Sequence, residues 1–542
     1  MTKTLRGEQA LALGALAAGV RVVSGYPGSP ATGVFDSLLA LTAPGEAHAQ
    51  WAANEKVALE LAFGASLGGS RALVVLKSVG LNIALDPLAT MALSGCHAGM
   101  VILLGDDPGG WGSQNEQDTR WLARVAEVPL VEPIGVEQAA ALMAQAYVWS
   151  EILGVPVIVR VTGALTLAEG VVEEPWQLPQ FDLHFRRKRN RWVVLPATVL
   201  SYHRLLHRHL RQMRELFEAS PFDSHSGQGP VGVVAVGCTH AKLLRATGEQ
   251  ASRLRILGLA SVWPLPERKL IRWLRGLERV LVLEEGGPFV EEGLSALAQR
   301  AGLGVSISGR HDRAIPEEGE LSEQEIATAL ARLDPSCQPA ERALTQRAMP
   351  SRVPLCDDCP YRPTFEALLR AVQRHGGRKR HIIVGETGCM VRANLSPFEL
   401  FDVKYGLGSG LGLALGLALS GTPERIVALL GDSSFFHSDI NALPQAAQLG
   451  LPVLALVLDN STTALTGGQP HPGSATDERG QPRPSSDLVA VIRGYGVEPR
   501  LCTPEDIPSM EAAFDEALEA EALRVIIVRG PCPKYAAQAS RG

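Results

Sequence analysis

Cysteine and aromatic residues are scarce in this chain, and neither sign of charge dominates. Eight cysteines in 542 residues are too few for a disulfide scaffold. The formal net charge is −6 and aromatic residues make up 5%, which argues against a protein whose main task is to grip nucleic acid or an anionic membrane. What is present is 46% apolar residues, enough to exclude disorder for most of the chain.

Long hydrophobic runs are also missing. The longest uncharged stretch, Tyr405 to Pro423, approaches the ~20 residues that a membrane span needs, but six of its residues are Gly and a strand follows at once. The apolar run that begins near Glu8 favours a helix over a signal peptide, because a strand and a tight turn follow it. We expect no membrane span and a cytoplasmic protein.

Short Val, Ile and Leu runs alternate with helical stretches, a pattern that predicts βα units on parallel sheets. The alternation is interrupted twice by Pro-rich or basic segments, and the basic run RRKRNR is interpreted as a solvated surface. The fold class expected is therefore α/β with three βα domains. The predicted boundaries are a first domain at 1–172, a linker at 173–228, a second domain at 229–311, a linker at 312–350 and a third domain at 351–542.

Two strand ends in RIVALLGDSSFFHSDINALPQAAQLGLPVLALVLDNSTTALTGGQ carry polar residues. Asp432 follows the strand that ends at Gly431, and Asn460 and Thr462 follow the one that ends at Asp459. Open α/β sheets bind ligands at this edge, and a carboxylate, an amide oxygen and loop carbonyls suit Mg²⁺. The alternative is that Asp432 only caps the next helix.

The spacing within this stretch favours the ligand interpretation. Ser433 and Asn460 are separated by 26 residues, the spacing of the thiamine diphosphate motif usually written GDG and NN. With GDSSFFHS and DNSTTALTGGQPHPG, the stretch resembles the thiamine diphosphate domain of 2-oxoacid:ferredoxin oxidoreductases of the indolepyruvate type. The resemblance implies that Asp432, Asn460 and the carbonyl of Thr462 bind Mg²⁺. It also implies a set of cofactor-binding residues: Gly431, Asp432, Ser433, Asn460, Thr462 and Leu407.

Thiamine catalysis needs a carboxylic group beside the aminopyrimidine ring, and Glu55 is the candidate. GYPGSPATGVFDSL and WAANEKVALELAFGAS resemble the pyrimidine-binding domain of the same family, with Glu55 at the glutamate position. Without the resemblance, a carboxylate favoured at a helix N-terminus would explain Glu55 about as well. The helix that follows is expected to bury its apolar residues: Val57, Leu59, Leu61, Ala62 and Ala65.

Candidates for contacting the 2-oxoacid come from two segments that also match the family. Ser29 lies at the family's YPGTP position, with Ser in place of Thr. Gln114 and Asn115 lie in GDDPGGWGSQNEQDTR, after the predicted strand GMVILLG. That position puts them at the ligand edge of the sheet, although such polar turns also occur in ordinary loops.

Four of the cysteines fall in the third domain, namely Cys356, Cys359, Cys389 and Cys532. A [4Fe–4S] cluster needs four thiolates, and in ferredoxins the last is often followed by Pro, as Pro533 follows Cys532. The resemblance implies that these cysteines bind the cluster nearest the thiamine. Zinc binding and a set of unliganded thiols remain alternatives.

The match to the indolepyruvate oxidoreductase alpha subunit family runs from about residue 7 to 535, with departures. CDDC replaces the usual CPGC, Tyr361 stands where His is common, and Asp439 stands where Gly is expected. The chain ends ten residues after Cys532, without the family's ferredoxin domain. We therefore expect electrons to leave through a separate subunit bearing ferredoxin-type clusters or a flavin, alongside the family's beta subunit, in a heterotetramer or on a homodimeric core.

The function implied by the resemblance is oxidative decarboxylation of a 2-oxoacid, such as an aryl pyruvate, to acyl-CoA and CO₂. Thiamine diphosphate, Mg²⁺ and one [4Fe–4S] cluster are the implied cofactors, and coenzyme A and the 2-oxoacid are the implied small-molecule partners. Two alternatives stay open. The chain could be a thiamine enzyme that decarboxylates or transfers acyl groups without oxidation, or a non-catalytic subunit that holds a partner.

Overall fold

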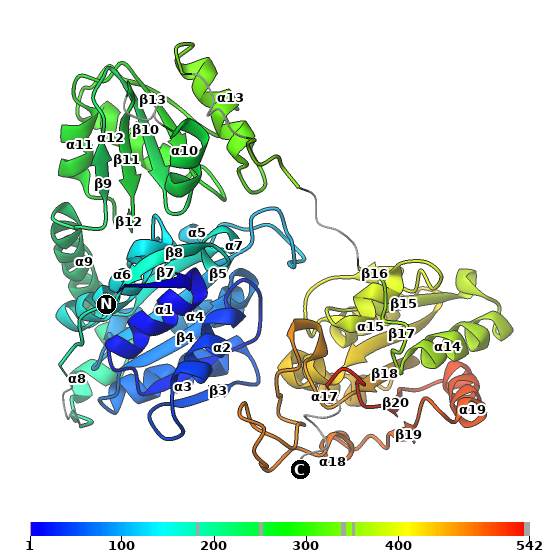
Figure 1. Cartoon of the computed structure of the whole chain (residues 1–542). Coiled ribbons are helices and arrows are strands. Elements are labelled where there is room, and N and C mark those ends of the chain that lie inside the picture. The colour runs from blue at the N-terminus through cyan, green and yellow to red at the C-terminus, as the bar shows by residue number, and fades with distance from the viewer. Residues whose placement is uncertain (1, 180–183, 249–252, 338–342, 349–352, 536–542) are drawn as a thin grey trace. The chain divides into compact units, whose positions relative to one another are not determined.

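The computed structural model describes residues 2–179, 184–248, 253–337, 343–348 and 353–535 (Figure 1). It divides into two compact units, one of residues 1–49 and 55–350 and the other of residues 50–54 and 351–542. Both units consist of parallel-dominated sheets with helices between the strands. The predicted α/β class is confirmed. Among the described helices, none is both long enough and apolar enough to cross a membrane.

The first unit begins with a largely parallel seven-stranded sheet, in the order β12-β6-β7-β5-β4-β2-β3. Its strands are β2 (Val22–Gly25), β3 (His48–Trp51), β4 (Ala72–Lys77), β5 (Met100–Asp106), β6 (Leu130–Val131), β7 (Val157–Thr162) and β12 (Ser261–Trp263). The helices between them are α1 (Gly7–Ala17), α2 (Thr32–Leu41), α3 (Glu55–Leu67), α4 (Ser78–Ser94), α5 (Arg120–Ala126), α6 (Val136–Leu153) and α7 (Gly163–Thr166). Every residue of β4, β5 and β7 is buried, as expected of strands covered on both faces.

A second sheet in the same unit has the order β14-β13-β10-β11-β9. Its strands are β9 (Ser224–Ser226), β10 (Val231–Val236), β11 (Arg255–Leu259), β13 (Arg279–Leu283) and β14 (Ser306–Ser308). Its helices are α10 (Thr239–Thr247), α11 (Glu267–Leu274), α12 (Phe289–Arg300) and α13 (Glu323–Leu333). Strand β12 follows β11 in the chain but pairs antiparallel with β6 of the first sheet. In this pairing Ser261 lies opposite Val131 and Trp263 lies opposite Leu130.

The segments expected to be linkers contain ordered elements. Residues 173–228 include α8 (Arg189–Trp192) and the long helix α9 (Pro196–Glu218), whose apolar stripe of Tyr202, Leu206, Met213 and Phe217 is buried. Residues 312–350 include α13, which packs on α10 because Ile326, Ala329 and Leu330 are buried in the core of the second sheet. A two-stranded antiparallel pair, β1 (Thr2–Arg6) with β8 (Glu169–Glu173), completes the unit.

The second unit has an all-parallel sheet in the order β16-β15-β17-β18-β20-β19. Its strands are β15 (His381–Gly385), β16 (Val403–Lys404), β17 (Arg425–Gly431), β18 (Val453–Asp459), β19 (Arg500–Cys502) and β20 (Arg524–Arg529). Its helices are α14 (Arg362–Arg374), α15 (Gly410–Leu419), α16 (Asp432–Ser434), α17 (Ile440–Leu449), α18 (Leu488–Gly494) and α19 (Ile507–Glu519), with short turns at η2 (Arg378–Arg380), η3 (Cys389–Asn394), η4 (Phe435–Asp439) and η5 (Ala464–Thr466).

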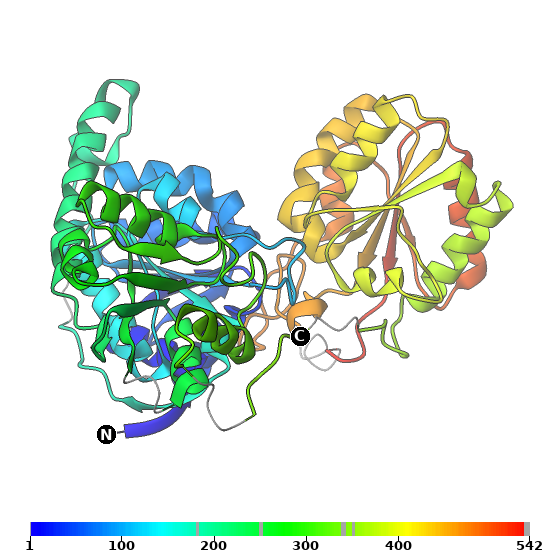
Figure 2. The same ribbon diagram turned by 90° about the horizontal axis from the view of Figure 1, so that it is seen from above.

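Figure 2 shows helices on both faces of this third sheet. One core forms on the face of α14 and α19, around Phe365, Leu368 and Phe514. A second core forms on the face of α15 and α17, around Leu411 and Leu443. The sheet is thus covered by helices on both faces. In such folds, the loops at the carboxyl edge of the sheet hold the ligands.

Candidate active site

Glu55 is the first residue of α3 and is buried, with 5% of its surface exposed. A Cβ added to Gly80, in the first turn of α4, would lie 2.5 Å from the Cγ and 2.6 Å from Oε1 of Glu55. Glycine at position 80 therefore leaves the room that the Glu55 side chain fills. The prediction that α3 buries its apolar residues is only half right. Leu59 and Ala62 are fully buried, but Val57 and Leu61, one turn apart, are 36% and 40% exposed because that side of the helix turns away from the strands.

The substrate candidates lie in loops that follow the carboxyl ends of neighbouring strands. Ser29 follows β2 and is exposed. Gln114 and Asn115 follow β5, are also exposed, and the Asn115 amide donates to Gln117 Oε1 at 3.1 Å. Because β2, β4 and β5 are consecutive parallel strands, these loops emerge from one edge of the sheet.

Lys77 is a residue at this edge that the sequence reasoning missed. It ends β4, is 8% exposed, and its Nζ donates to the Gly112 carbonyl at 2.8 Å and lies 3.5 Å from Asp107 Oδ2. Burial lowers the pKa of Lys77, and Asp107 opposes that effect. A Cβ on Gly28 would lie 2.8 Å from Lys77 Cβ, so the loop before Ser29 packs directly on this lysine. A charged residue at the end of a wholly apolar strand was the signal available in the sequence.

In the second unit, Asp432 is the buried centre of the candidate diphosphate and metal site. Its Oδ2 accepts hydrogen bonds from the backbone N–H groups of Asn460 at 3.0 Å and Ser461 at 2.7 Å. The His471 imidazole Nε2 lies 3.1 Å from the same oxygen, and the Ser433 N–H donates to Oδ1 at 2.7 Å. The ends of β17 and β18 are thereby tied together by one carboxylate. His471, in QPHPG, is a second residue that the sequence reasoning missed.

The loop after β18 is shaped by local hydrogen bonds. Ser461 has φ +61°, a left-handed conformation that non-glycine residues seldom adopt, and its carbonyl accepts from Ser474 Oγ at 2.7 Å. The Asn460 side-chain oxygen accepts from the Thr462 N–H at 3.0 Å. On the strand itself, burial raises the pKa of Asp459, helped by the nearby Asp432 charge and opposed by Arg529, whose Nε donates to Asp459 Oδ2 at 2.7 Å.

The donor set fits a hard divalent cation. Asp432, Asn460 and Thr462, the three predicted Mg²⁺ ligands, are brought together at adjacent strand ends and offer only oxygen atoms. A carboxylate or amide oxygen has two lone pairs, and Asp432 Oδ2 already accepts two backbone N–H groups. Asp432 Oδ1 and Asn460 Oδ1 each accept one backbone N–H, so each keeps a lone pair for a cation. Ser433 lies beside them, with its Oγ 3.0 Å from Thr463 Oγ1.

The remaining cofactor-binding candidates lie in the backbone around Asp432. Gly431 donates its N–H to the fully buried Glu386 at 3.2 Å, and burial together with the neighbouring Asp439 raises the pKa of Glu386. Leu407 is half-buried in the loop before α15. The next residue, Gly408, has φ +67° and would place a Cβ 2.5 Å from that of Ser438, so this loop approaches the helix that begins at Asp432 as closely as glycine permits.

The four candidate cluster cysteines converge at the same edge of the sheet. Cys356 and Cys359 precede α14, Cys389 follows β15, and Cys532 follows β20. Burial raises the pKa of Cys389 to about 12, opposed by Arg392 and reinforced by the other three thiols. Each of the other three thiols thus lies near enough to Cys389 to act on it electrostatically.

The group that these thiols would bind depends on how close together they lie. Among the described residues, no three of them bring their sulfur atoms within 4.8 Å of one another. Tetrahedral zinc with Zn–S bonds of about 2.3 Å would bring thiolates to within roughly 4 Å. Four cysteines can supply the thiolates of an iron–sulfur cluster or of a zinc site, so both remain compatible with these residues. Burial, followed by the nearby carboxylates and thiols, raises the pKa of Tyr361, and its buried hydroxyl has no partner among the described residues.

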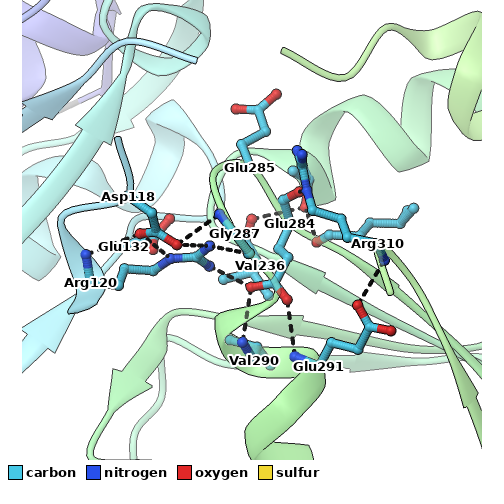
Figure 3. A network of polar contacts seen from close by, with 12 residues as sticks. Asp118, Arg120, Glu132, Val236, Glu284, Glu285, Gly287, Val290, Glu291 and Arg310 are labelled. Atoms are coloured by element: carbon cyan, nitrogen blue, oxygen red, sulfur yellow. Dashed lines mark hydrogen bonds and ion pairs between the residues drawn. The ribbon is translucent and has the colours of Figure 1, made fainter. Parts of the chain in front are cut away.

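A buried network of charges joins the two sheets of the first unit (Figure 3). Arg120, at the start of α5, donates to Asp118 at 2.7 and 2.8 Å, to Glu284 after β13 at 2.6 Å, and to the Gly287 carbonyl at 2.8 Å. Glu284 also accepts the N–H groups of Val290 and Glu291, in the first turn of α12, at 2.9 Å each. Burial alone would lower the pKa of Arg120, but Asp118 and Glu284 hold it above its usual value. The network fixes one sheet against the other.

Two thiamine-related family models match parts of this chain. Residues 13–196 match the family model "Pyruvate flavodoxin/ferredoxin oxidoreductase, thiamine diP-bdg", and residues 386–528 match "Thiamine pyrophosphate enzyme, C-terminal TPP binding domain". The "Indolepyruvate oxidoreductase subunit IorA" of Methanothermobacter thermautotrophicus is 34% identical over 97% of this chain and 86% of its own length. That of Pyrococcus abyssi is 33% identical over 98% of this chain and 86% of its own length. A more distant relative is the benzoylformate decarboxylase of Pseudomonas aeruginosa, 29% identical over 39% of this chain and 40% of its own length.

The fold and the matched domains define a thiamine diphosphate-dependent enzyme of the 2-oxoacid oxidoreductase class. Within that class, relatives at 32% to 34% identity over nearly the whole chain make the family clear. The chain belongs to the family of the indolepyruvate oxidoreductase subunit IorA. Since these relatives are named as subunits, a partner subunit is implied.

Proposed function

We propose that this chain catalyses oxidative decarboxylation of an aryl 2-oxoacid, such as indolepyruvate, to an acyl-CoA. In the balanced reaction, the 2-oxoacid anion and coenzyme A yield acyl-CoA, CO₂ and one proton, and two electrons pass to an external acceptor through a partner subunit. The observation that supports the proposal is that both expected carboxylates, Glu55 and Asp432, are buried. A buried carboxylate begins α3, and Asp432 joins the ends of β17 and β18.

Thiamine diphosphate, when bound, would supply the carbon nucleophile and the electron sink that decarboxylation of a 2-oxoacid needs. Asp432, Asn460 and the Thr462 carbonyl would hold Mg²⁺ against the diphosphate. The backbone at Gly431 and Ser433, and the side chain of Leu407, would line the rest of the cofactor.

Glu55 is proposed as the group that holds and returns a proton at its carboxylate oxygen next to the aminopyrimidine. Its burial excludes water from that oxygen, and Gly80 leaves it room. Ser29 is proposed to contact the 2-oxoacid, with Gln114 and Asn115 at the rim of the same edge. Lys77 places one cation at this edge, where the carboxylate of a 2-oxoacid would be attracted.

Electron exit is proposed to use one [4Fe–4S] cluster on Cys356, Cys359, Cys389 and Cys532. The electrostatic influence of the other three thiols on Cys389 supports a common site for the four cysteines. A single cluster passes electrons one at a time and needs an acceptor, so we propose that the beta subunit and a ferredoxin-type or flavin-bearing protein complete the enzyme.

The test is anaerobic purification of the chain with the subunit that binds it, followed by iron analysis and by reduction of a viologen dye with indolepyruvate and coenzyme A. Glu55→Gln should abolish dye reduction while leaving iron content unchanged. Glu60→Gln is the matched control, since Glu60 is an exposed residue of the same helix that pairs with Lys56. Full activity in the Glu55→Gln variant would overturn the role of this carboxylate.

The partial similarity to a benzoylformate decarboxylase favours one second candidate, a thiamine enzyme that releases CO₂ without oxidation. Under that alternative the four cysteines are structural. CO₂ release from the 2-oxoacid with no bound iron and no dye reduction would establish it, and would refute the cluster.

A further inference from the structure

Three metal-binding side chains meet on the first unit, in a place that the reaction proposed above does not use. They are His203 and His207 of α9 and Glu127 at the end of α5. One ligand atom from each lies within 4.8 Å of the others. Among the described residues, these are the three His, Cys, Asp or Glu side chains whose ligand atoms all lie within 4.8 Å of one another.

Helical spacing brings the two imidazoles together. His203 and His207 are four residues apart, so both rings lie on one face of α9, with ring centroids 4.2 Å apart. Their Nε2 atoms lie 2.5 and 2.9 Å from the two carboxylate oxygens of Glu127. Two nitrogens and a carboxylate from helices about 80 residues apart in sequence therefore converge on one point.

The backbone at Glu127 is held in an unusual conformation. Glu127 caps α5 with φ +56° and ψ +38°, the left-handed region that glycine and asparagine favour at this position. Strained backbone persists where the surrounding structure enforces it, commonly at binding sites. Here the conformation directs a carboxylate onto α9.

We propose that Glu127, His203 and His207 form a binding site for a divalent metal ion of borderline softness, such as Zn²⁺. Two imidazoles and one carboxylate are the donors of many three-ligand zinc sites, whereas Mg²⁺ and Ca²⁺ prefer oxygen donors only. The three side chains are 27% to 46% exposed, so an ion enters from solvent and a water molecule completes its coordination.

The metal ion would act as a clip on α9. The C-terminal end of this helix is already anchored, because Lys269 Nζ of α11 donates to the Phe217 carbonyl at 2.7 Å and Trp149 of α6 packs edge-on against the Phe217 ring. The clip would fix the N-terminal half of α9 to α5. Since Arg120 at the other end of α5 belongs to the buried network, the ion would brace the same junction of the two sheets from outside.

The other explanation of the geometry is a metal-free clasp, in which both Nε2–H groups donate to the Glu127 carboxylate. The two explanations differ in their response to metal. If the three side chains form only hydrogen bonds, zinc should leave the free energy of unfolding unchanged or lower it. If they bind zinc, the free energy of unfolding should rise with the logarithm of the zinc concentration above the dissociation constant.

The test is equilibrium dialysis of the full chain, first stripped with a chelator, against Zn²⁺ alone, followed by metal analysis and thermal unfolding. The wild type should bind one more zinc ion per chain than the His203→Gln/His207→Gln double variant, and Zn²⁺ should raise its melting temperature by several degrees more. The cysteines contribute equally to both proteins, so the difference reports this site. Glu127→Gln should weaken binding at the site by roughly tenfold or more.

His209→Gln is the matched control, because His209 lies on the same helix outside the cluster. It should bind as much zinc as the wild type. A second readout is the Co²⁺ difference spectrum between the wild type and the double variant, which should lack the intense sulfur-to-cobalt band given by thiolate ligands. Equal zinc binding and equal melting shifts in the wild type and the double variant, with both folded in chelator, would overturn the proposal.

Discussion

The buried network in the first unit gives the sharpest quantitative prediction. Arg120 has no exposed side-chain surface, and its guanidinium donates to two carboxylates and one carbonyl. Replacing it by Ala leaves Asp118 and Glu284 with fewer partners in a dry environment. Removing one member of such a buried pair costs about 3–5 kcal/mol.

The expected change in melting temperature follows from the size of the unit. Roughly 345 residues unfold together in the first unit, and unfolding entropy is about 2 cal/mol/K per residue, so 1 kcal/mol corresponds to roughly 1.4 °C. Arg120→Ala should therefore lower the melting temperature of this unit by about 4–7 °C in scanning calorimetry. Arg124→Ala is the control on the same helix, where an exposed side chain stacks over Trp121 and Trp263, and it should cost about 1 kcal/mol or less.

The pH dependence supplies an independent check. Burial raises the pKa of Asp118, but Arg120, with smaller contributions from Arg160 and the Gly287 N–H, outweighs it, so the pKa lies below the ordinary value for Asp. An Asp with a depressed folded-state pKa adds stability above its unfolded pKa of about 3.9, and that stability is lost as the pH falls through the folded value. The deficit of Arg120→Ala should be largest near neutral pH and should narrow below about pH 4. A deficit no larger than that of Arg124→Ala, or one independent of pH, would refute the assignment of this network as a stabilising junction.

Three further predictions concern the candidate active site. Gly80→Ala should move Glu55 and lower the activity of the partner-bound enzyme at least about tenfold. The control is Gly64→Ala on α3, because a Cβ at position 64 meets nothing within 4 Å. This variant should keep full activity and have a slightly higher melting temperature, since Ala favours a helix more than Gly does. Asp432→Asn should abolish Mg²⁺-dependent thiamine diphosphate binding measured by calorimetry, because an amide presents an N–H₂ group where the carboxylate accepts N–H donors; binding at wild-type affinity would contradict the site. In cluster-free protein at pH 8, iodoacetamide should label the exposed Cys356 well before Cys389, whose pKa of about 12 leaves it protonated; mass spectrometry after brief labelling measures the order, and equal rates would be the contrary result.

The predictable part of this structure was what short segments determine by themselves. Apolar runs such as MVILLGD identified buried strands, and polar residues at strand ends identified Asp432 and Asn460 as neighbours, because parallel strands end at one edge of a sheet. The helix beginning at Glu55 was also expected, and α3 begins at that residue.

What the sequence could not reveal depends on long-range packing. Arg120 and Glu284 are 164 residues apart, and nothing in either segment indicates that they meet. The exposure of Val57 and Leu61 was missed because apolar residues occur on all sides of α3, so periodicity did not separate a buried face from an outer one. Strand β12 has three residues, too few to carry a pattern, and its partner β6 has two.

That short pairing has a consequence for how the protein is made. Strand β7 of the first sheet ends at Thr162, but the strand that covers the edge of β6 is completed only at Trp263, about 100 residues later. At about 5–20 residues per second, the ribosome needs roughly 5–20 seconds to synthesise the intervening chain. During that interval the nascent first sheet has an open edge with unpaired backbone groups, so this is the period in which the growing chain depends most on chaperones.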